Sequence, residues 1–444
     1  MRPARYNVPV AGRWPKRVLT LLMAPLAACS LLVDRDVGVR DGDESDGGVP
    51  SDGGPDGGGG PGPCGSIGRL QDEFSGSELS WHWVPRTQGA AANQPVTDGV
   101  LRLRFDPVPG ADEFTEVESR FAYDLRDHDV TVRALDQGAA GWTTLEVRAA
   151  GAFDRPRRII GLGRLGDDLV AFVAGDPIDT IRSVPFNGGD HRYWRIRESG
   201  GVLEFEVAGD SRVFSPFTSL TDPGLDLGAV TVGLQLFSGD PPNAAIGSSV
   251  FDDFNAGADA DPACSIDTLH DDFSAADLGP LWIDNGDQGL CDLSTGDGLS
   301  LAVDSGAACY VDSARAYSFA GGGVLVAELT EMPDPADART ALRLAHDPEN
   351  FAELVQQDGE LTISLTERGA ESSSLTLPNA VNAQVWRVTE RDGDLVVETS
   401  TDGDAFSLRH TLSPVALDLA ELRVSFSLRS SPLAGATLAG INVK

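Results

Sequence analysis

The chain has 444 residues, of which 41% are hydrophobic and 51 are glycine, enough for more than one globular domain with many turns. It carries 68 acidic and 34 basic residues, a formal net charge of −34. Nucleic-acid binding depends on Lys and Arg that neutralise phosphates, so this balance argues against a nucleic-acid partner. No apolar run reaches the roughly 20 residues that a membrane-spanning helix needs.

Residues 1–28 have the composition of a secretory signal. They contain five basic residues and no acid, and they end in a short apolar run from Val18 to Ala28. The ending Leu26-Ala27-Ala28-Cys29 resembles a bacterial lipobox, which implies cleavage before Cys29 and lipidation of that cysteine. Ser30 in the next position implies, in lipoproteins, export to the outer membrane. The alternative is an ordinary secretory signal followed by a chance cysteine.

Residues 29–63 are predicted to be a lipidated cysteine followed by a disordered linker. The stretch is mostly Asp, Gly, Pro and Ser and has almost nothing to bury. The mature chain without residues 1–28 is strongly acidic and would be repelled by anionic lipids, so we expect contact with the membrane through the lipid anchor only. The Asp-rich linker lacks the 12-residue calcium-loop pattern, so calcium is conceivable but has no motif to support it, and we expect no cofactor.

The remainder of the chain repeats itself. In each copy an Asp-x-Phe-Ser motif is followed by a Trp nine residues after its Phe. Further along, a Trp-Arg-aliphatic strand is followed by a turn and a second alternating strand. The clearest matching pairs are Asp72–Ser75 with Asp271–Ser274, Trp83 with Trp282, Val117–Leu125 with Val311–Phe319, and His191–Asp210 with Ala383–Asp404. We predict two modules, 64–257 and 264–444.

Within each copy, apolar and polar residues alternate over four to eight positions, with Gly, Asp, Asn and Pro between the runs. This pattern is typical of half-buried antiparallel strands. We therefore predict an all-β protein with two tandem antiparallel β-sandwich domains after the linker. Trp194 with Ile196, facing Leu203, Phe205 and Val207, is expected in the first core. Trp386 with Val388, facing Leu395 and Val397, is expected in the second.

The two copies resemble the concanavalin A-like lectin and glucanase superfamily, and more narrowly its laminin-G-like jelly-roll branch in bacterial surface proteins. The resemblance rests on the Asp-x-Phe and Trp motifs, the Trp194 and Trp386 hairpins, and the closing Phe251-Asp252-Asp253-Phe254. The second copy ends instead in Ala439-Gly440-Ile441-Asn442, a weaker match. The resemblance implies jelly-roll domains located at the outer membrane or cell surface.

Four cysteines follow Cys29. Cys291 and Cys309 lie in one predicted hairpin region of the second copy, and both are missing from the first, where Ala92 and Thr115 align with them. Their joint absence predicts a disulfide, which an exported protein can keep. Cys64 and Cys264 open the two copies, and whether they pair is left open. No Cys-x-x-Cys pair supports a metal site.

Catalytic motifs are not recognisable. A laminarinase-type hydrolase needs two carboxylates on one strand face within a three-acid motif, and the nearest fragments, around Glu116-Val117-Glu118 and Glu204-Phe205-Glu206, lack the third acid. We interpret these glutamates as solvated strand-face residues. The six histidines lack a nucleophile motif. Gly161–Gly166 has dinucleotide-type glycine spacing but precedes a strand. The sequence therefore predicts a non-enzymatic protein.

Binding remains. We predict a lipid-anchored surface protein whose modules bind a polysaccharide or surface glycan. Trp81, His82 and Trp142 are candidate ligand residues, because they have no aromatic counterparts in the second copy and an exposed ring can cover a sugar face. Local packing is the competing explanation for these side chains. Alternative functions are a structural or adhesive protein with protein partners, or a glycoside hydrolase with an unrecognised site.

Overall fold

The structure is a computed structural model that describes residues 64–443. Excepted are 89–94, 106–113, 138–141, 151–156, 175–178, 211–212, 238–246, 259–261, 287–289, 305, 332–337, 379–382 and 431–433. The predicted signal peptide (1–28), the lipidation site Cys29 and the predicted linker (29–63) lie outside the described residues. In the part of the chain that is described, no helix has the length and apolar character that crossing a membrane would require.

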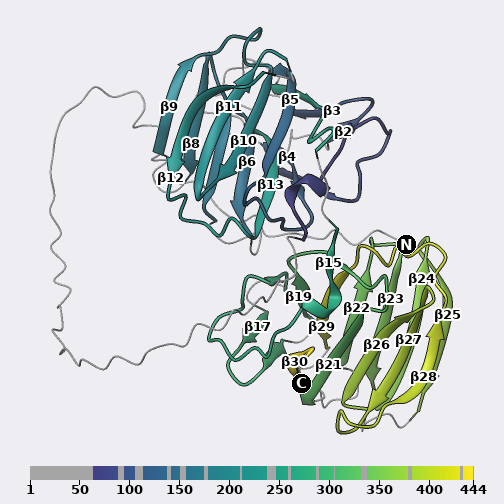
Figure 1. The fold of residues 1–444 in the computed structure, drawn as a ribbon. Coiled ribbons are helices and arrows are strands. Elements are labelled where there is room, and N and C mark those ends of the chain that lie inside the picture. The colour runs from purple at the N-terminus through teal and green to yellow at the C-terminus, as the bar shows by residue number, and fades with distance from the viewer. Residues whose placement is uncertain are drawn as a thin grey trace, which may run out of the picture. The chain divides into compact units, whose positions relative to one another are not determined.

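The first repeat forms two seven-stranded antiparallel sheets, coloured purple to teal in Figure 1. One sheet has the order β1-β4-β13-β6-β7-β8-β9 and the other the order β12-β11-β10-β5-β14-β3-β2. A short 3₁₀ turn, η2 (Ile67–Arg69), precedes them. The strands are β1 (Trp83–Gln88), β2 (Val96–Thr97), β3 (Leu101–Phe105), β4 (Phe114–Ser119), β5 (Asp129–Gln137), β6 (Trp142–Ala149), β7 (Ile159–Leu165), β8 (Asp168–Ala174), β9 (Asp179–Pro185), β10 (Tyr193–Ser199), β11 (Val202–Ala208), β12 (Ser215–Thr221), β13 (Val230–Phe237) and β14 (Gly247–Asp252).

The second repeat has the same strand order, β16-β19-β29-β22-β23-β24-β25 facing β17-β18-β30-β21-β26-β27-β28. A two-residue parallel bridge, β15 with β20, and the 3₁₀ turn η3 (Ile266–Thr268) complete it. The strands are β15 (Cys264–Ser265), β16 (Trp282–Asp284), β17 (Cys291–Ser294), β18 (Leu299–Val303), β19 (Ala308–Ser313), β20 (Tyr317–Ser318), β21 (Val324–Glu331), β22 (Arg339–Ala345), β23 (Phe351–Gln357), β24 (Glu360–Glu367), β25 (Ala370–Leu377), β26 (Val385–Arg391), β27 (Asp394–Ser400), β28 (Ser407–Leu412), β29 (Arg423–Arg429) and β30 (Ala434–Ile441). The predicted all-β fold with two antiparallel sandwiches is confirmed.

The repeated Asp-x-Phe…Trp motif has the same hydrogen bonds in both copies. The Asp72 carboxylate accepts from the Phe74 backbone N–H at 2.7 Å and from Trp83 Nε1 at 2.9 Å. Asp271 accepts the corresponding bonds from Phe273 and Trp282 at the same two distances. The carboxylate thus satisfies a turn amide and a mostly buried indole together, which explains why Asp, Phe and Trp recur at this spacing.

The two cores are built as the alternation predicts. Trp194, Ile196, Leu203 and Phe205 are fully buried, and Val207 is 8% exposed. In the second sandwich Trp386, Val388, Leu395 and Val397 are at most 1% exposed. Each sandwich has one large apolar cluster that draws on both of its sheets. Packing of these side chains between sheets removes them from water, and this burial is the main stabilising term for such a fold.

Both cysteine pairs form disulfides. Cys291–Cys309 is confirmed, but the two residues lie on β17 and β19, which belong to different sheets of the second sandwich, rather than within one hairpin. The bridge therefore crosses from one sheet to the other. Cys64–Cys264 joins residues 200 positions apart, at the starts of the two repeats, and answers the question that the sequence left open.

Candidate functional site

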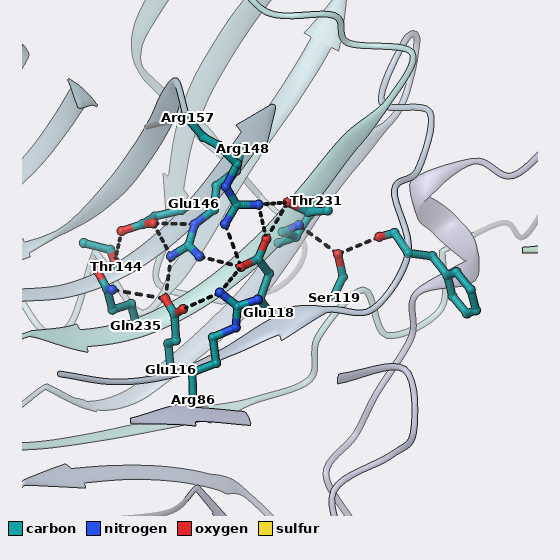
Figure 2. Close-up of polar contacts among 12 residues, drawn as sticks. Arg86, Glu116, Glu118, Ser119, Thr144, Glu146, Arg148, Arg157, Thr231 and Gln235 are labelled. Atoms are coloured by element: carbon teal, nitrogen blue, oxygen red, sulfur yellow. Dashed lines mark hydrogen bonds and ion pairs between the residues drawn. The ribbon is translucent and has the colours of Figure 1, made fainter. Parts of the chain in front are cut away.

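The outer face of the sheet β4-β13-β6 in the first sandwich carries a buried network of charges (Figure 2). Glu116 and Glu118 alternate with core residue Val117 on β4, so both point away from the core. Arg148 of β6 donates to Glu116 at 2.7 Å, to Glu118 at 2.9 Å and to Glu146 at 2.6 Å. Arg157 donates to both oxygens of Glu118, at 2.6 and 3.0 Å.

The backbone of β13 makes room for this network. Gly233 stands between Glu118 and Glu146 in register, and a Cβ atom built on it would lie 2.8 Å from the Arg148 guanidinium carbon. Any side chain at position 233 would displace the guanidinium from the three carboxylates. Glycine is therefore required here by close approach of a neighbouring side chain.

The charges of the network are balanced and shielded. Arg86 adds ion pairs to Glu118 at 3.6 Å and Glu116 at 3.9 Å, so three arginines face three glutamates. Burial alone would raise the pKa of Glu118, but the guanidinium groups of Arg148 and Arg157 outweigh it and lower that pKa to about 2. A carboxylate held ionised in this way cannot act as a general acid near neutral pH.

The prediction that these glutamates are solvated is wrong. Glu116 is 3% exposed and Glu118 is fully buried, because arginines from other parts of the sheet cover them. Glu206 is also buried, paired with Arg195 at 2.5 Å, and only its neighbour Glu204 remains partly exposed. Glu116, Glu118 and Glu146 form ion pairs that close off the β4-β13-β6 face, whereas the Glu206–Arg195 pair lies on the other sheet.

The equivalent face of the second sandwich is open. Matching the strand pairings of the two copies makes Ala345 the equivalent of Arg148. The same match makes Ser425 the equivalent of Gly233. Alanine and serine in these positions leave out the counterpart of the Arg148 guanidinium that fills the first face. A cavity of about 290 Å³ lies there instead. Its lining includes residues of β19, β22, β23 and β29, chiefly Tyr310, Asp312, Arg339, Arg343, Glu353 and Arg423.

The cavity combines an aromatic ring with charged groups. Tyr310 occupies the place of Glu116 and is 38% exposed. Asp312, at the place of Glu118, accepts from Asn285 at 2.7 Å and lies 3.4 Å from an Arg423 nitrogen. Arg339 pairs with Glu353 at 2.5 Å. Small side chains, Ser425 and Ser427, form the floor of the cavity next to Tyr310 and Asp312.

Two of the predicted ligand residues, Trp81 and His82, contact residues of the second repeat. The Trp81 ring lies 4.3 Å from the His346 ring of the second repeat, and within the first repeat its carbonyl accepts from Arg120 at 2.6 Å. His82 Nε2 lies 3.2 Å from a Glu421 oxygen. These contacts give both side chains a packing role, which explains their absence from the second copy. Their sugar-binding role stays a prediction.

Trp142, the third predicted ligand residue, lies on β6, on the same face as Glu146 and Arg148. It is half-buried and meets the Phe172 ring edge to face, with ring centroids 6.0 Å apart. Register places Arg339 of the open cavity at the position of Trp142. The structure thus separates Trp142 from Trp81 and His82, and its sugar-binding role also stays a prediction.

A second cavity, in the first sandwich, lacks the features of a sugar site. A cavity of about 760 Å³ lies among turns of the first sandwich, but Glu198 in its lining already binds the backbone amides of Asp127 and Gly201. No aromatic residue lines it. Among the residues the structure describes, no group of three or more His, Cys, Asp or Glu is arranged to hold a metal ion. The prediction that no cofactor is used is not tested by this.

Sequence reasoning missed Tyr310, Arg343 and Arg423. The signal was present, since Tyr310-Val311-Asp312 aligns with Glu116-Val117-Glu118. A comparison of outward positions between the copies would have revealed an aromatic residue in place of an acid.

Comparison with known proteins gives likenesses of fold. No protein-family model and no curated protein sequence matches the chain. Three solved structures that match are a β-glucanase of Bacillus licheniformis (12% identity, 39% of this chain and 95% of that one, TM-score 0.31), the Crh5 transglycosylase (11%, 40% and 85%, TM-score 0.32) and Bacteroides ovatus xyloglucan PUL GH43B (9%, 80% and 96%, TM-score 0.34). The all-β sandwich architecture is shown by the sheets themselves, and membership of the concanavalin A-like superfamily stays a prediction.

The prediction that the protein is not an enzyme is contradicted by these comparisons. The matched structures are a β-glucanase, a transglycosylase and a GH43 protein. The absence of a recognisable motif was therefore insufficient to exclude catalysis. At such low identity the likeness is one of fold and names no reaction for this chain.

Proposed function

We propose that this protein is a carbohydrate-active surface protein that holds a polysaccharide on the open face of the second sandwich. The observation that carries the proposal is the exposed Tyr310 ring in a polar cavity on a sheet face. An aromatic ring covers the apolar face of a sugar, while Asp312, Arg339, Arg343 and Glu353 supply hydrogen bonds to hydroxyl groups.

Substitution of Tyr310 tests this proposal. The full chain is applied to a polysaccharide array, and the polymers that bind are then titrated with Tyr310→Ala and Tyr193→Ala. We expect Tyr310→Ala to weaken binding about tenfold, equivalent to about 1.4 kcal/mol. Tyr193→Ala, a tyrosine truncation on β10 of the first sandwich, serves as the matched control and should bind as the unaltered protein does. Failure of the chain to bind any polysaccharide would refute the proposal.

Glycoside hydrolysis is the second candidate. Asp312 and Glu353 lie on the cavity face in one register row with Ser425 and Arg343 between them, on strands about 14 Å apart, so their side chains would have to reach toward each other to act as a pair. Glycoside hydrolases use two carboxylates that flank the bond to be cleaved. The same incubations are therefore assayed for new reducing ends. Release that disappears in Asp312→Asn, with binding retained, would support hydrolysis; no release from any bound polymer would reject it.

We also propose that Cys29 anchors the protein to the outer membrane or cell surface through lipid. The support is the signal-like composition of residues 1–28 and the lipobox-like Leu26-Ala27-Ala28-Cys29. Attached acyl chains would hold the acidic chain at a membrane that otherwise repels it. Cys29→Ala should leave the protein unlabelled by a fatty-acid analogue and shift it to the soluble fraction. Unchanged labelling and membrane recovery would contradict this anchor.

A further inference from the structure

We propose that the polysaccharide held at the second-sandwich cavity is acidic, and that arginines of the cavity bind its carboxylate or sulfate groups. This inference rests on the proposed function and specifies the ligand class of that same site. Two observations support it: arginines outnumber carboxylates in the cavity lining, and two of these arginines form no ion pair among the described residues.

The cavity is richer in positive charge than the protein around it. The chain has a formal charge of −34. The lining, however, has four arginines from the second sandwich together with Arg120, against three carboxylates. They are Arg339, Arg343, Arg423 and Arg429, with Asp312, Asp347 and Glu353. A positive site in a strongly acidic chain favours an anionic ligand at short range, because the surrounding charge is screened by salt over about 8 Å.

Not all of these arginines have an acidic partner. Arg339 and Arg423 pair with Glu353 and Asp312. Within the described part of the chain, Arg343 and Arg429 form no ion pair with a carboxylate. Arg343 lies 3.5 Å over the Phe351 ring and donates to the Pro348 carbonyl at 3.3 Å.

The third carboxylate does not neutralise them. Asp347 is bound by the backbone amides of Glu349 and Asn350, both at 2.8 Å, and by the Asn350 side chain at 2.8 Å. These bonds turn it toward its own loop. Two positive charges on the cavity face are therefore left for a ligand.

Two arginines of the cavity, Arg120 and Arg343, are also partly desolvated. Burial lowers the pKa of Arg343, and burial together with the charge of Arg423 lowers the pKa of Arg120 to about 10. Both remain cationic at neutral pH. The Nε of Arg343 is buried and has no hydrogen-bond partner among the described residues. A partly desolvated cation gains most from a ligand that carries charge.

Guanidinium groups bind carboxylate and sulfate groups through paired N–H donors. A neutral sugar would offer Arg343 and Arg429 only hydroxyl oxygens, whereas an acidic sugar would supply each of them with the ion-pair partner that it lacks among the described residues. A chain of acidic sugars instead places an anion at each repeat, so one residue can stack on Tyr310 while its neighbour reaches the arginines. Ser425 and Ser427 leave the floor between them free of bulky side chains.

Matched polymers test the inference. The full chain is titrated with polygalacturonate and with its methyl ester, and with dextran sulfate and unmodified dextran. We expect at least tenfold tighter binding to an acidic member than to its neutral partner, weakened by added salt. A preference for polygalacturonate identifies the carboxylate as the recognised group, and one for dextran sulfate identifies the sulfate.

Arginine variants locate the effect. Arg343→Gln and the more exposed Arg429→Gln should each weaken binding to the acidic polymer about tenfold and leave any neutral binding unchanged. Arg197→Gln removes the same charge from β10 in the first sandwich and should bind as the unaltered protein does. Equal affinity for acidic and neutral members would overturn this inference while leaving the proposed function intact. Binding to neither acidic polymer, while another polysaccharide of the array binds, would likewise overturn this inference alone, and binding to no polysaccharide of the array would overturn both.

Discussion

At the scale of single residues, one arginine distinguishes the two sandwiches. Arg148 occupies the centre of the β4-β13-β6 face and binds three glutamates, whereas Ala345 leaves the corresponding face open. The acids of the first face were visible in the sequence, but their partners were not. Arg148 and Arg157 are 30 and 39 residues from Glu118, and only the sheet brings them together.

Arg148→Met tests whether the ion pairs of Arg148 with the three glutamates stabilise the first sandwich. The substitution keeps much of the side-chain volume but leaves buried carboxylates without their central cation. Removal of one partner of a buried ion pair costs about 3–5 kcal/mol, so we expect a loss of that size in the free energy of unfolding of the first sandwich, measured by urea denaturation.

Arg197→Met is the matched control for Arg148→Met, because Arg197 is an exposed arginine of the same sandwich. It should change the unfolding free energy by no more than about 0.5 kcal/mol. An Arg148→Met protein as stable as this control would show that the network contributes little and that the closed face has another cause.

At the scale of strands and turns, most of the fold could be predicted because alternation and turn residues are local signals. The Trp194 and Trp386 hairpins appear as β10-β11 and β26-β27, and both tryptophans are fully buried. The Gly161–Gly166 stretch, expected before a strand, lies mostly within β7 itself. Strand existence follows from the pattern of side chains, which depends only on neighbouring residues.

The assignment of strands to sheets was harder to predict. Cys291 and Cys309 are 18 residues apart and suggested a hairpin, yet β17 and β19 belong to opposite sheets. Alternation gives the buried face of each strand but does not say which strands become its neighbours. The disulfide prediction was correct because it rested on the joint absence of both cysteines from the first copy, an observation that does not depend on which strands are neighbours.

At the scale of the whole molecule, the chain contains one fold twice, with equivalent faces put to different uses. The first face is neutralised and filled by its own side chains. The second combines Tyr310 with arginines around an open cavity. Fold could be inferred from repetition, whereas the candidate site could not, because it lies where the copies differ. Trp81 and His82 also differ between copies, but they contact His346 and Glu421 of the second repeat.

Hydrogen–deuterium exchange of the full chain, with and without a bound oligosaccharide, tests the central claim that the second-sandwich cavity holds the glycan. We predict slower exchange in peptides that contain Tyr310, Arg343 and Ser427, on β19, β22 and β29, and unchanged exchange around Glu118 and Arg148. Protection confined to the first sandwich, with none on those three strands, would contradict the account.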